Sequence, residues 1–352
     1  MNFYYPISVL VAFGLTVFLL LLLRPVAFHI GLVDHPGERK LHGGAVPLIG
    51  GIAMFVAFCF SILTLDIPIS SLRAMFAGSL ILIFIGVLDD MHELSTRARF
   101  IAQIIAATTM AVWGGVILSD FGHLVSTAFI VELGWLAIPV TVFAAIGVIN
   151  ALNMLDGIDG LAGFVSLVSV VGMAIISYAA GDTNTLLILG LLASVLAAFL
   201  IFNLRCDNEN CSLVFMGDAG SMFLGFVLSW FLITLSQGDE RAMAPVTALW
   251  LFGAPLLETL TMIIRRTRHG RSPFSADREH LHHMLELAGF SKRAILATIF
   301  FASLLFAVLG LLGHFLRIPE PVMFYSFLAL FGGYMVLIKW GWGKIRDERR
   351  KS

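Results

Sequence analysis

Long apolar runs recur along this chain from one end to the other, each about as long as a membrane is thick. A helix needs roughly 17–25 mostly apolar residues to cross the hydrocarbon core of a bilayer. Eleven such runs lie near 4–23, 47–65, 71–88, 100–118, 134–150, 160–179, 184–202, 219–236, 244–264, 294–313 and 322–340. They predict an all-α membrane protein, a polytopic bundle of about eleven transmembrane helices.

The composition excludes a soluble globular domain. Of the 352 residues, 59% are hydrophobic and only 13% are charged, a balance that soluble domains do not have. We find no repeat, low-complexity tract or separate soluble segment, so the sequence predicts one polytopic domain over residues 1–352. The first run has no charged segment before it and no small-residue cleavage site after it, which indicates a retained span rather than a removed signal peptide.

The basic residues predict the orientation of the chain. All but three of the 22 Lys and Arg residues fall in one set of alternating loops, the exceptions being Arg73, Arg241 and Arg317. Loops rich in Lys and Arg stay in the cytoplasm. We therefore expect the N-terminus outside and the C-terminus in the cytoplasm. The net charge of −1 gives no further information on the orientation. We expect no nucleic-acid partner.

The segment NALNMLDGIDGL, residues 150–161, places polar side chains at the end of the fifth run. Asn150, Asn153 and Asp156 are spaced by three, so on a continuing helix they share one side. An Asp in hydrocarbon costs roughly 2.5–3.5 kcal/mol on insertion scales and therefore needs water, a cation or a partner. A functional site and a plain polar loop after a span are both open interpretations here.

Further carboxylates lie at the ends of other runs. Asp89 and Asp90 end the third run, where the helix dipole disfavours anions unless a cation is near. Asp218, in FMGDAGS (215–221), stands where the eighth run begins. Solvated carboxylates for the first pair, and an ordinary helix cap for Asp218, are the alternatives to a site.

Basic side chains and histidines follow the ninth run. Glu258 lies within that run, where a functional role and a hydrogen-bonded packing role are both open. After it comes RRTRHGRSPFSADREHLHH, residues 265–283, which ends in His280, His282 and His283. Three His without a fixed carboxylate are a weak zinc signal, and they serve equally as phosphate donors. Lys40, before the glycine turn PLIGG, is a further candidate for phosphate.

These clusters all fall on the side predicted to be cytoplasmic. Carboxylates with carboxamides bind Mg²⁺, which prefers oxygen ligands and substrate phosphates, and Arg and His bind phosphate. Phosphoryl transfer needs this combination. A transporter for a lipid-linked sugar, the alternative from another class, would instead place polar residues near the bilayer midplane. The residues therefore favour a magnesium-dependent phosphoryl transferase that acts at the membrane surface on a lipid.

Five sequence elements occur in order along nearly the whole chain. They are GLVDHPGERKLHGGAVPLIGG (31–51), LDD (88–90), NALNMLDGIDGL (150–161), FMGDAGS (215–221) and SPFSADREHLHH (272–283). With these elements the chain resembles the polyprenyl-phosphate N-acetylhexosamine-1-phosphate transferase family, also grouped as glycosyltransferase 4. The last element is similar to the branch that uses UDP-N-acetylglucosamine and undecaprenyl phosphate.

The resemblance implies a reaction and a membrane. The phosphate of undecaprenyl phosphate attacks the β-phosphorus of UDP-N-acetylglucosamine, giving undecaprenyl-diphospho-N-acetylglucosamine and UMP. This would be the first step of a lipid-linked cell-surface polysaccharide of the O-antigen or lipopolysaccharide kind, at the bacterial inner membrane. Mg²⁺, with Mn²⁺ as a substitute, is the implied cofactor. A sister enzyme using another UDP-N-acetylhexosamine or UDP-MurNAc-pentapeptide is the nearest alternative, and dimerisation is left open.

The resemblance also implies roles for individual residues. It assigns the metal to Asp218 and Asn153. It assigns catalysis to Asp89, Asp90, Asp156 and Asp159. It assigns substrate binding to Lys40, Arg97, Asn150, Asn203, Arg271, His280, His282 and His283. Glu93 and Glu258 stand where relatives more often have Asp, and they receive no role.

Overall fold

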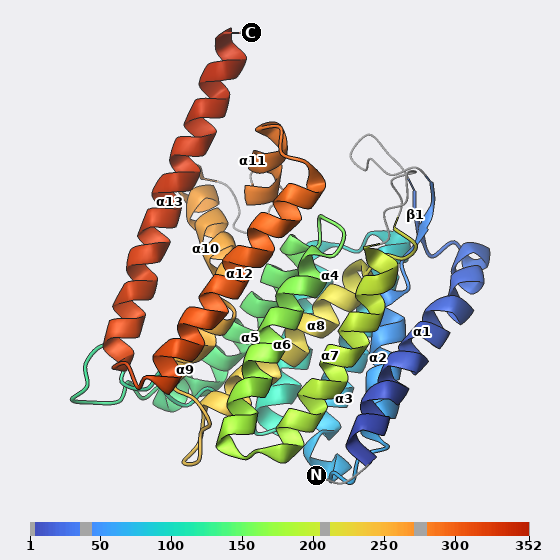
Figure 1. Cartoon of the computed structure of the whole chain (residues 1–352), viewed down its shortest axis with the longest axis horizontal. Helices are drawn as coiled ribbons and strands as arrows, with labels where there is room; N and C mark the ends of the chain where they lie inside the picture. Colours follow the sequence, from blue (N-terminus) through green and yellow to red (C-terminus); the bar gives the residue numbers. More distant parts are fainter. Residues whose placement is uncertain (1–3, 36–43, 205–211, 271–279, 352) are drawn as a thin grey trace. The chain divides into compact units, whose positions relative to one another are not determined.

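A computed structural model describes residues 4–35, 44–204, 212–270 and 280–351 (Figure 1). The chain divides into two compact units, Met1–Ser119 with Leu133–Ala242 and Asp120–Glu132 with Met243–Ser352. We refer to them as unit 1 and unit 2 and describe each by itself. A single domain over 1–352 stays a prediction.

Unit 1 is built from helices and one short hairpin. The helices are α1 Tyr4–Ile30, α2 Gly50–Ile62, α3 Arg73–His92, α4 Thr96–Thr108, α5 Ala137–Leu155, α6 Leu161–Ala180, α7 Thr183–Asn203 and α8 Gly217–Ser236. Strands β1 Val33–Asp34 and β2 Val46–Pro47 pair antiparallel. A π-helical turn, Thr109–Trp113, follows α4, and short 3₁₀ turns lie at Ile69–Ser71 and Gly134–Leu136.

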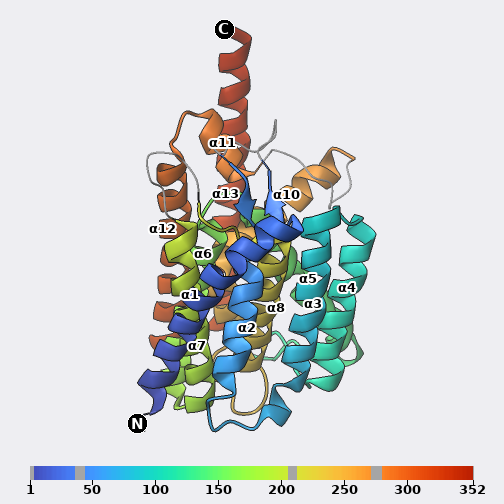
Figure 2. The ribbon, with the colours of Figure 1, turned by 90° about the vertical axis from the view of Figure 1, so that its right-hand side faces the viewer.

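Helix α8 is the centre of unit 1. Helices α2, α3, α5 and α6 pack against it, and Figure 2 shows it behind α2 and beside α3 and α5. Within its apolar window 94% of the residues are buried. A helix that is apolar on all sides must be covered by protein or lipid, and here protein covers it. Gly217 begins this helix and Asp218 follows it. Both are therefore surrounded by neighbouring helices.

Two close backbone approaches position the start of α8. A Cβ on Gly51 would collide with the backbone of Gly220, and one on Gly86 would collide with the backbone of Ala219. Only glycine allows helices to come this near. In addition, the backbone N–H groups of Gly50 and Gly51 donate to the carbonyls of residues 215 and 216 at 2.9 and 3.0 Å. The PLIGG and FMGDAGS elements, far apart in sequence, therefore meet.

The described part of unit 2 contains five helices around a small apolar core. They are α9 Pro245–Leu251, α10 Gly253–Arg268, α11 Leu281–Leu287, α12 Lys292–Phe315 and α13 Glu320–Lys351. Val246, Trp250, Leu257, Met323 and Phe327 are its buried centre. Helices α9 and α10 meet at an angle of 84°. The apolar run predicted near 244–264 is therefore helical but broken at Phe252.

The all-α membrane class is confirmed. Among the described residues, eight helices are long and apolar enough to cross a membrane, or nine if the bent α9–α10 pair is one span. The other two predicted runs are also helical, but α2 is only 13 residues long and α4 passes into the π-helical turn after Thr108. The count of eleven and the orientation stay predictions.

Candidate active site

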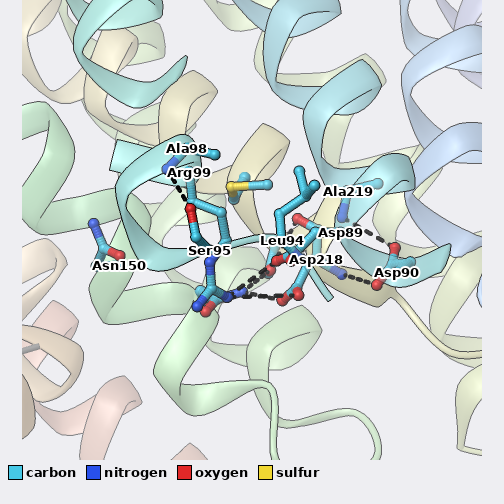
Figure 3. A network of polar contacts seen from close by, with 12 residues as sticks. Asp89, Asp90, Leu94, Ser95, Ala98, Arg99, Asn150, Asp218 and Ala219 are labelled. Carbon is cyan, nitrogen blue, oxygen red and sulfur yellow. Dashed lines mark hydrogen bonds and ion pairs between the residues drawn. The ribbon is translucent and has the colours of Figure 1, made fainter. Parts of the chain in front are cut away.

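The carboxylate of Asp90 caps the first turn of α8. Its Oδ1 accepts a hydrogen bond from the backbone N–H of Asp218 at 2.9 Å, and its Oδ2 accepts one from Ala219 at 3.4 Å (Figure 3). The first N–H groups of a helix have no partner within the helix, and the dipole there favours an anion. The cap requires glycine at position 217, where φ is +72° and a Cβ would lie 2.5 Å from Asp90 Oδ2. Asp90 therefore ties the end of α3 to the helix that carries Asp218.

Asp89 points to the other side of the same junction. It is 5% exposed. Its Oδ1 accepts from the backbone N–H of Leu94 at 2.6 Å, and its Oδ2 pairs with Arg99 Nη1 at 3.0 Å. The same guanidinium nitrogen lies 3.8 Å from Asp218 Oδ2. Figure 3 shows these three side chains converging, so one cation from α4 is shared by two carboxylates from α3 and α8.

Arg99 is the residue that the sequence analysis missed. The residue predicted to bind phosphate on this helix is Arg97, whose side chain is exposed and lies on the opposite side of α4; that role stays a prediction. A signal was available, because Ala102, Gln103 and Ala106 are small or amide residues at helical spacing and all three are buried. Arg99 stands three residues before that stripe, on the same face. Reading the stripe as the buried face would have selected Arg99.

Asn153 holds the carboxylate of Asp218. Its Nδ2 donates to Asp218 Oδ1 at 2.5 Å and to Ser221 Oγ at 2.9 Å. In this arrangement the amide of α5 orients the carboxylate at the start of α8. As a metal ligand, Asn153 would instead use its amide oxygen. Its role as a metal ligand stays a prediction.

Asp156 faces several negative charges just beyond the end of α5. Burial raises the pKa of this carboxyl well above its ordinary value of 3.8, and the negative charges of Asp218, Asp90 and Asp159 raise it further. Both causes disfavour the charged form. The four carboxylates therefore make a region with excess negative charge, which a cation would stabilise.

Asp159 and Asn203 have structural partners in the same unit. Ser212 Oγ donates to Asp159 Oδ2 at 2.5 Å. Asn203 is buried, accepts from the N–H of Gly160 at 2.5 Å and donates to the carbonyl of Val214 at 2.9 Å. These bonds connect the start of α6 with the segment that leads into α8. The catalytic and substrate-binding roles predicted for the two residues stay predictions.

Asn150 lies away from the carboxylates. Its Nδ2 donates to Gln103 Oε1 at 2.7 Å and to the carbonyl of Ile146 at 2.8 Å, and Gln103 in turn reaches Met222 Sδ at 3.6 Å. An amide pair inside a membrane bundle satisfies polar groups and joins helices. The structure thus gives Asn150 a contact between α4 and α5; its predicted role in substrate binding is untested.

The three predicted histidines lie at the start of α11, in unit 2. His280 and His282 are buried, and His280 Nδ1 is 3.1 Å from Glu258 Oε1. His283 Nδ1 is 3.7 Å from Glu286 Oε2, with a third of the His side chain exposed. Lys40 and Arg271, the remaining predicted phosphate contacts, lie outside the described residues.

The donor set of unit 1 suits a hard cation. Among the described residues, no three His, Cys, Asp or Glu side chains are close enough to hold a metal as they stand. Asp89 and Asp218 nevertheless offer carboxylate oxygens to one shared position, now filled in part by the guanidinium of Arg99. Mg²⁺ keeps several waters and is usually bound through one or two carboxylates plus substrate phosphates, so these residues fit it.

Known proteins with sequences similar to this chain include transferases of one kind. The profile described as glycosyl transferase family 4 matches residues 72–236, the stretch that holds the carboxylates. A protein of Yersinia pestis is 38% identical over 328 residues, 93% of this chain and 89% of its own length. Relatives in Escherichia coli K12 and Haemophilus influenzae are also 38% identical, covering 96% and 98% of this chain and 92% and 97% of their own length. All three are named undecaprenyl-phosphate alpha-N-acetylglucosaminyl 1-phosphate transferase.

Proposed function

The chain belongs to glycosyl transferase family 4, and on this premise we propose that it transfers N-acetylglucosamine 1-phosphate from UDP-N-acetylglucosamine to undecaprenyl phosphate. A phosphate oxygen of the lipid forms a bond to the β-phosphorus of the sugar nucleotide. The bond from that phosphorus to the bridging oxygen breaks, and UMP leaves. One phosphoanhydride replaces another, so the reaction is readily reversible.

The observation that carries this proposal is the convergence of Asp89, Arg99 and Asp218. Two carboxylates and a guanidinium from three helices meet at the junction where Asp90 caps α8. Phosphoryl transfer asks a protein mainly to position phosphates and to balance their charge. A set containing both signs, with Asp89 held by the backbone N–H of Leu94 and Asp218 by the amide of Asn153, supports that task.

The residues of unit 1 have distinct parts in the proposed reaction. Asp90 keeps the first turn of α8 in place, and Asn153 orients the carboxylate of Asp218. Arg99 can donate to a phosphate oxygen when it turns from Asp218, because the 3.8 Å contact is the longer of its two. Asp89 holds Arg99 in position and is the candidate to receive a proton from a lipid phosphate that is not fully ionised.

Mg²⁺, with Mn²⁺ as a substitute, is the cofactor we propose, held by the carboxylate of Asp218 together with Asn153. When bound, it would neutralise the pyrophosphate and stabilise the leaving UMP. Asp159 adds negative charge around this position, and a bound cation would favour the charged form of Asp156. That charge favours a divalent cation over a monovalent one.

We propose the cytoplasmic membrane of a bacterium as the location, with the site facing the cytoplasm. The distribution of basic residues supports this orientation. UDP-sugars are made in the cytoplasm, which suits a donor site on that side. An O-antigen-like polymer as the later product rests on the resemblance alone.

The test is a transfer assay with purified protein. Radiolabelled UDP-N-acetylglucosamine, undecaprenyl phosphate and MgCl₂ are incubated, and the label is followed into organic solvent. We expect label in a lipid that releases N-acetylglucosamine on mild acid hydrolysis, together with one UMP per lipid formed. UDP-N-acetylgalactosamine and UDP-MurNAc-pentapeptide serve as alternative donors. Transfer from either of these at a higher kcat/KM would overturn the choice of donor, and the absence of any lipid product would overturn the activity.

A further inference from the structure

Glu258 is the centre of a buried polar network in unit 2. It lies on α10 and is 6% exposed. Its Oε1 accepts from the backbone N–H of Leu281 at 2.8 Å and from His280 Nδ1 at 3.1 Å. Its Oε2 accepts from the hydroxyl of Tyr334, on α13. One carboxylate thus joins three helices, α10, α11 and α13.

The contacts of His280 select one tautomer of its ring. Its second nitrogen, Nε2, lies 3.5 Å from Arg266 Nη2. A guanidinium can only donate hydrogen bonds, so Nε2 must offer its lone pair. The proton therefore sits on Nδ1 and is donated to Glu258. In this way the carboxylate determines both the position of the ring and the nitrogen that carries the proton, because the hydrogen bond made by one ring nitrogen sets the tautomer.

His280 also supports the two other imidazoles. Its ring is stacked on that of His282 at a centroid distance of 5.6 Å and an angle of 8°, and the ring of His282 lies 4.2 Å from that of His283. Burial lowers the pKa of His282 to about 3, with further lowering by His283 and His280. The middle ring is therefore neutral and packed. His283, with 31% of its side chain exposed, is the most accessible of the three.

We propose that Glu258 is a positioning residue for the donor substrate: by holding His280 and the first N–H of α11, it orients the imidazole row that presents His283 to the sugar nucleotide. This inference rests on the proposed function. Glu258 acts through its partners and does not touch the substrate. It accounts for a buried carboxylate that the transfer chemistry of unit 1 does not use.

The position and the charge of Glu258 can be tested separately. In Glu258→Gln the amide oxygen still accepts from Leu281 and His280, and the amide nitrogen can donate to the hydroxyl of Tyr334. Only the charge is lost. In Glu258→Ala all three bonds are lost, and α11 is no longer attached to α10 at this point. Glu240→Gln is the matched control, because it makes the same chemical change at an exposed carboxylate outside the network of Glu258.

Steady-state kinetics in detergent give the first readout. For Glu258→Ala we expect kcat/KM for UDP-N-acetylglucosamine to fall about 100-fold, the effect of a misplaced binding group. For Glu258→Gln we expect a fall of about tenfold, the difference between a charged and a neutral hydrogen-bond acceptor. The KM for undecaprenyl phosphate and all constants of Glu240→Gln should stay near those of the wild type. Each rate is divided by the amount of folded protein, taken from the thermal unfolding transition.

The ¹⁵N NMR spectrum of histidine-labelled protein gives a second readout that needs no activity. The His280 signals are identified by their loss in His280→Gln. In the wild type we expect the proton on Nδ1, and in Glu258→Gln a mixture of the two tautomers. This measurement remains informative if Glu258→Ala does not fold.

Three results would overturn the inference. They are a wild-type His280 protonated on Nε2, a Glu258→Gln variant with wild-type kinetics and tautomer, and losses that vanish once rates are expressed per folded molecule. If the wild type itself makes no lipid product while the tautomer depends on Glu258, the proposed function fails and the positioning of His280 stands.

Discussion

Asp90 accepts a hydrogen bond from the backbone N–H of Asp218 across 128 positions of sequence, at 2.9 Å. Its neighbour Asp89 faces Arg99 instead. Two adjacent carboxylates that look equivalent in the sequence therefore have different partners: one caps a helix, and the other pairs with a guanidinium. Substitutions of Asp90 and of Asp89 should therefore have different effects on stability and on the rate of transfer.

The Asp90 cap should depend on the acceptor oxygens at this position. Asp90→Asn keeps one acceptor oxygen for the N–H groups of Asp218 and Ala219, whereas Asp90→Ala keeps none, and losing a capping acceptor costs about 1 kcal/mol of stability. We expect Asp90→Asn to unfold closer to the wild-type temperature in detergent than Asp90→Ala. In the transfer assay, Asp89→Asn should lose at least about two decades of rate, the range of a positioned acid–base or charge role, and Asp90→Asn should lose less. The reverse order would show that Asp90 is the reacting member of the pair.

Asp218 should carry the response to magnesium. Asp218→Asn keeps the shape and the helix start but removes the charged oxygen that suits Mg²⁺. We expect transfer to be abolished, and any residual rate to depend less on MgCl₂ concentration. The rate is measured over a magnesium titration with Asp239→Asn, an exposed carboxylate of the same unit, as control. Substantial turnover with the wild-type magnesium response would contradict the assignment.

Arg99 and Arg97 should differ strongly in effect. Arg99 pairs with Asp89, whereas Arg97 is exposed. Truncating one charged hydrogen bond typically costs about 1.5–3 kcal/mol, so Arg99→Gln should lower kcat/KM roughly 10- to 150-fold. The matched variant Arg97→Gln should stay close to the wild type. Equal losses of kcat/KM in the two variants would mean that the total positive charge of α4, and not the position of Arg99, supports the reaction.

His282 should make the stability of the protein depend on pH. Its pKa in the folded state is lowered from 6.5 to about 3, so the unfolded chain takes up a proton that the folded chain does not. The stability due to the neutral ring is fully present above pH 6.5 and is lost as the pH falls towards 3. We expect a slope of at most about 1.4 kcal/mol per pH unit in that window.

The measurement is the thermal unfolding temperature from pH 4 to pH 8. The slope should be smaller in His282→Gln and unchanged in His269→Gln, where the exposed ring lies at the end of α10. An identical slope in all three proteins would assign the pH dependence to other groups.

The predicted orientation can be tested by cysteine labelling. In a variant without the native cysteines, Thr96→Cys should react with a membrane-impermeant maleimide only after cells are permeabilised. Asp239→Cys should react in intact cells. Both positions are exposed, so accessibility within the protein does not limit the reaction. Labelling of the Thr96→Cys variant in intact cells would contradict the predicted orientation.

The sequence alone determined the class of this protein and the position of its polar side chains along each helix. Apolar runs of membrane length predict helices because a backbone in lipid must satisfy its own hydrogen bonds. They also predict that Asp89, Asp156 and Asp218 stand at helix ends, since a charged side chain inside the hydrocarbon is costly. Both effects are local, so they are visible in a single chain.

Only the tertiary structure decided which polar groups meet. The cap of Asp90 on α8 and the pairing of Arg99, not Arg97, with Asp89 depend on how neighbouring helices are rotated and how closely they approach. The bend at Phe252 likewise lies in a run whose composition alone resembles a straight span. Such partnerships join residues far apart in the chain, and periodicity within one helix does not encode them.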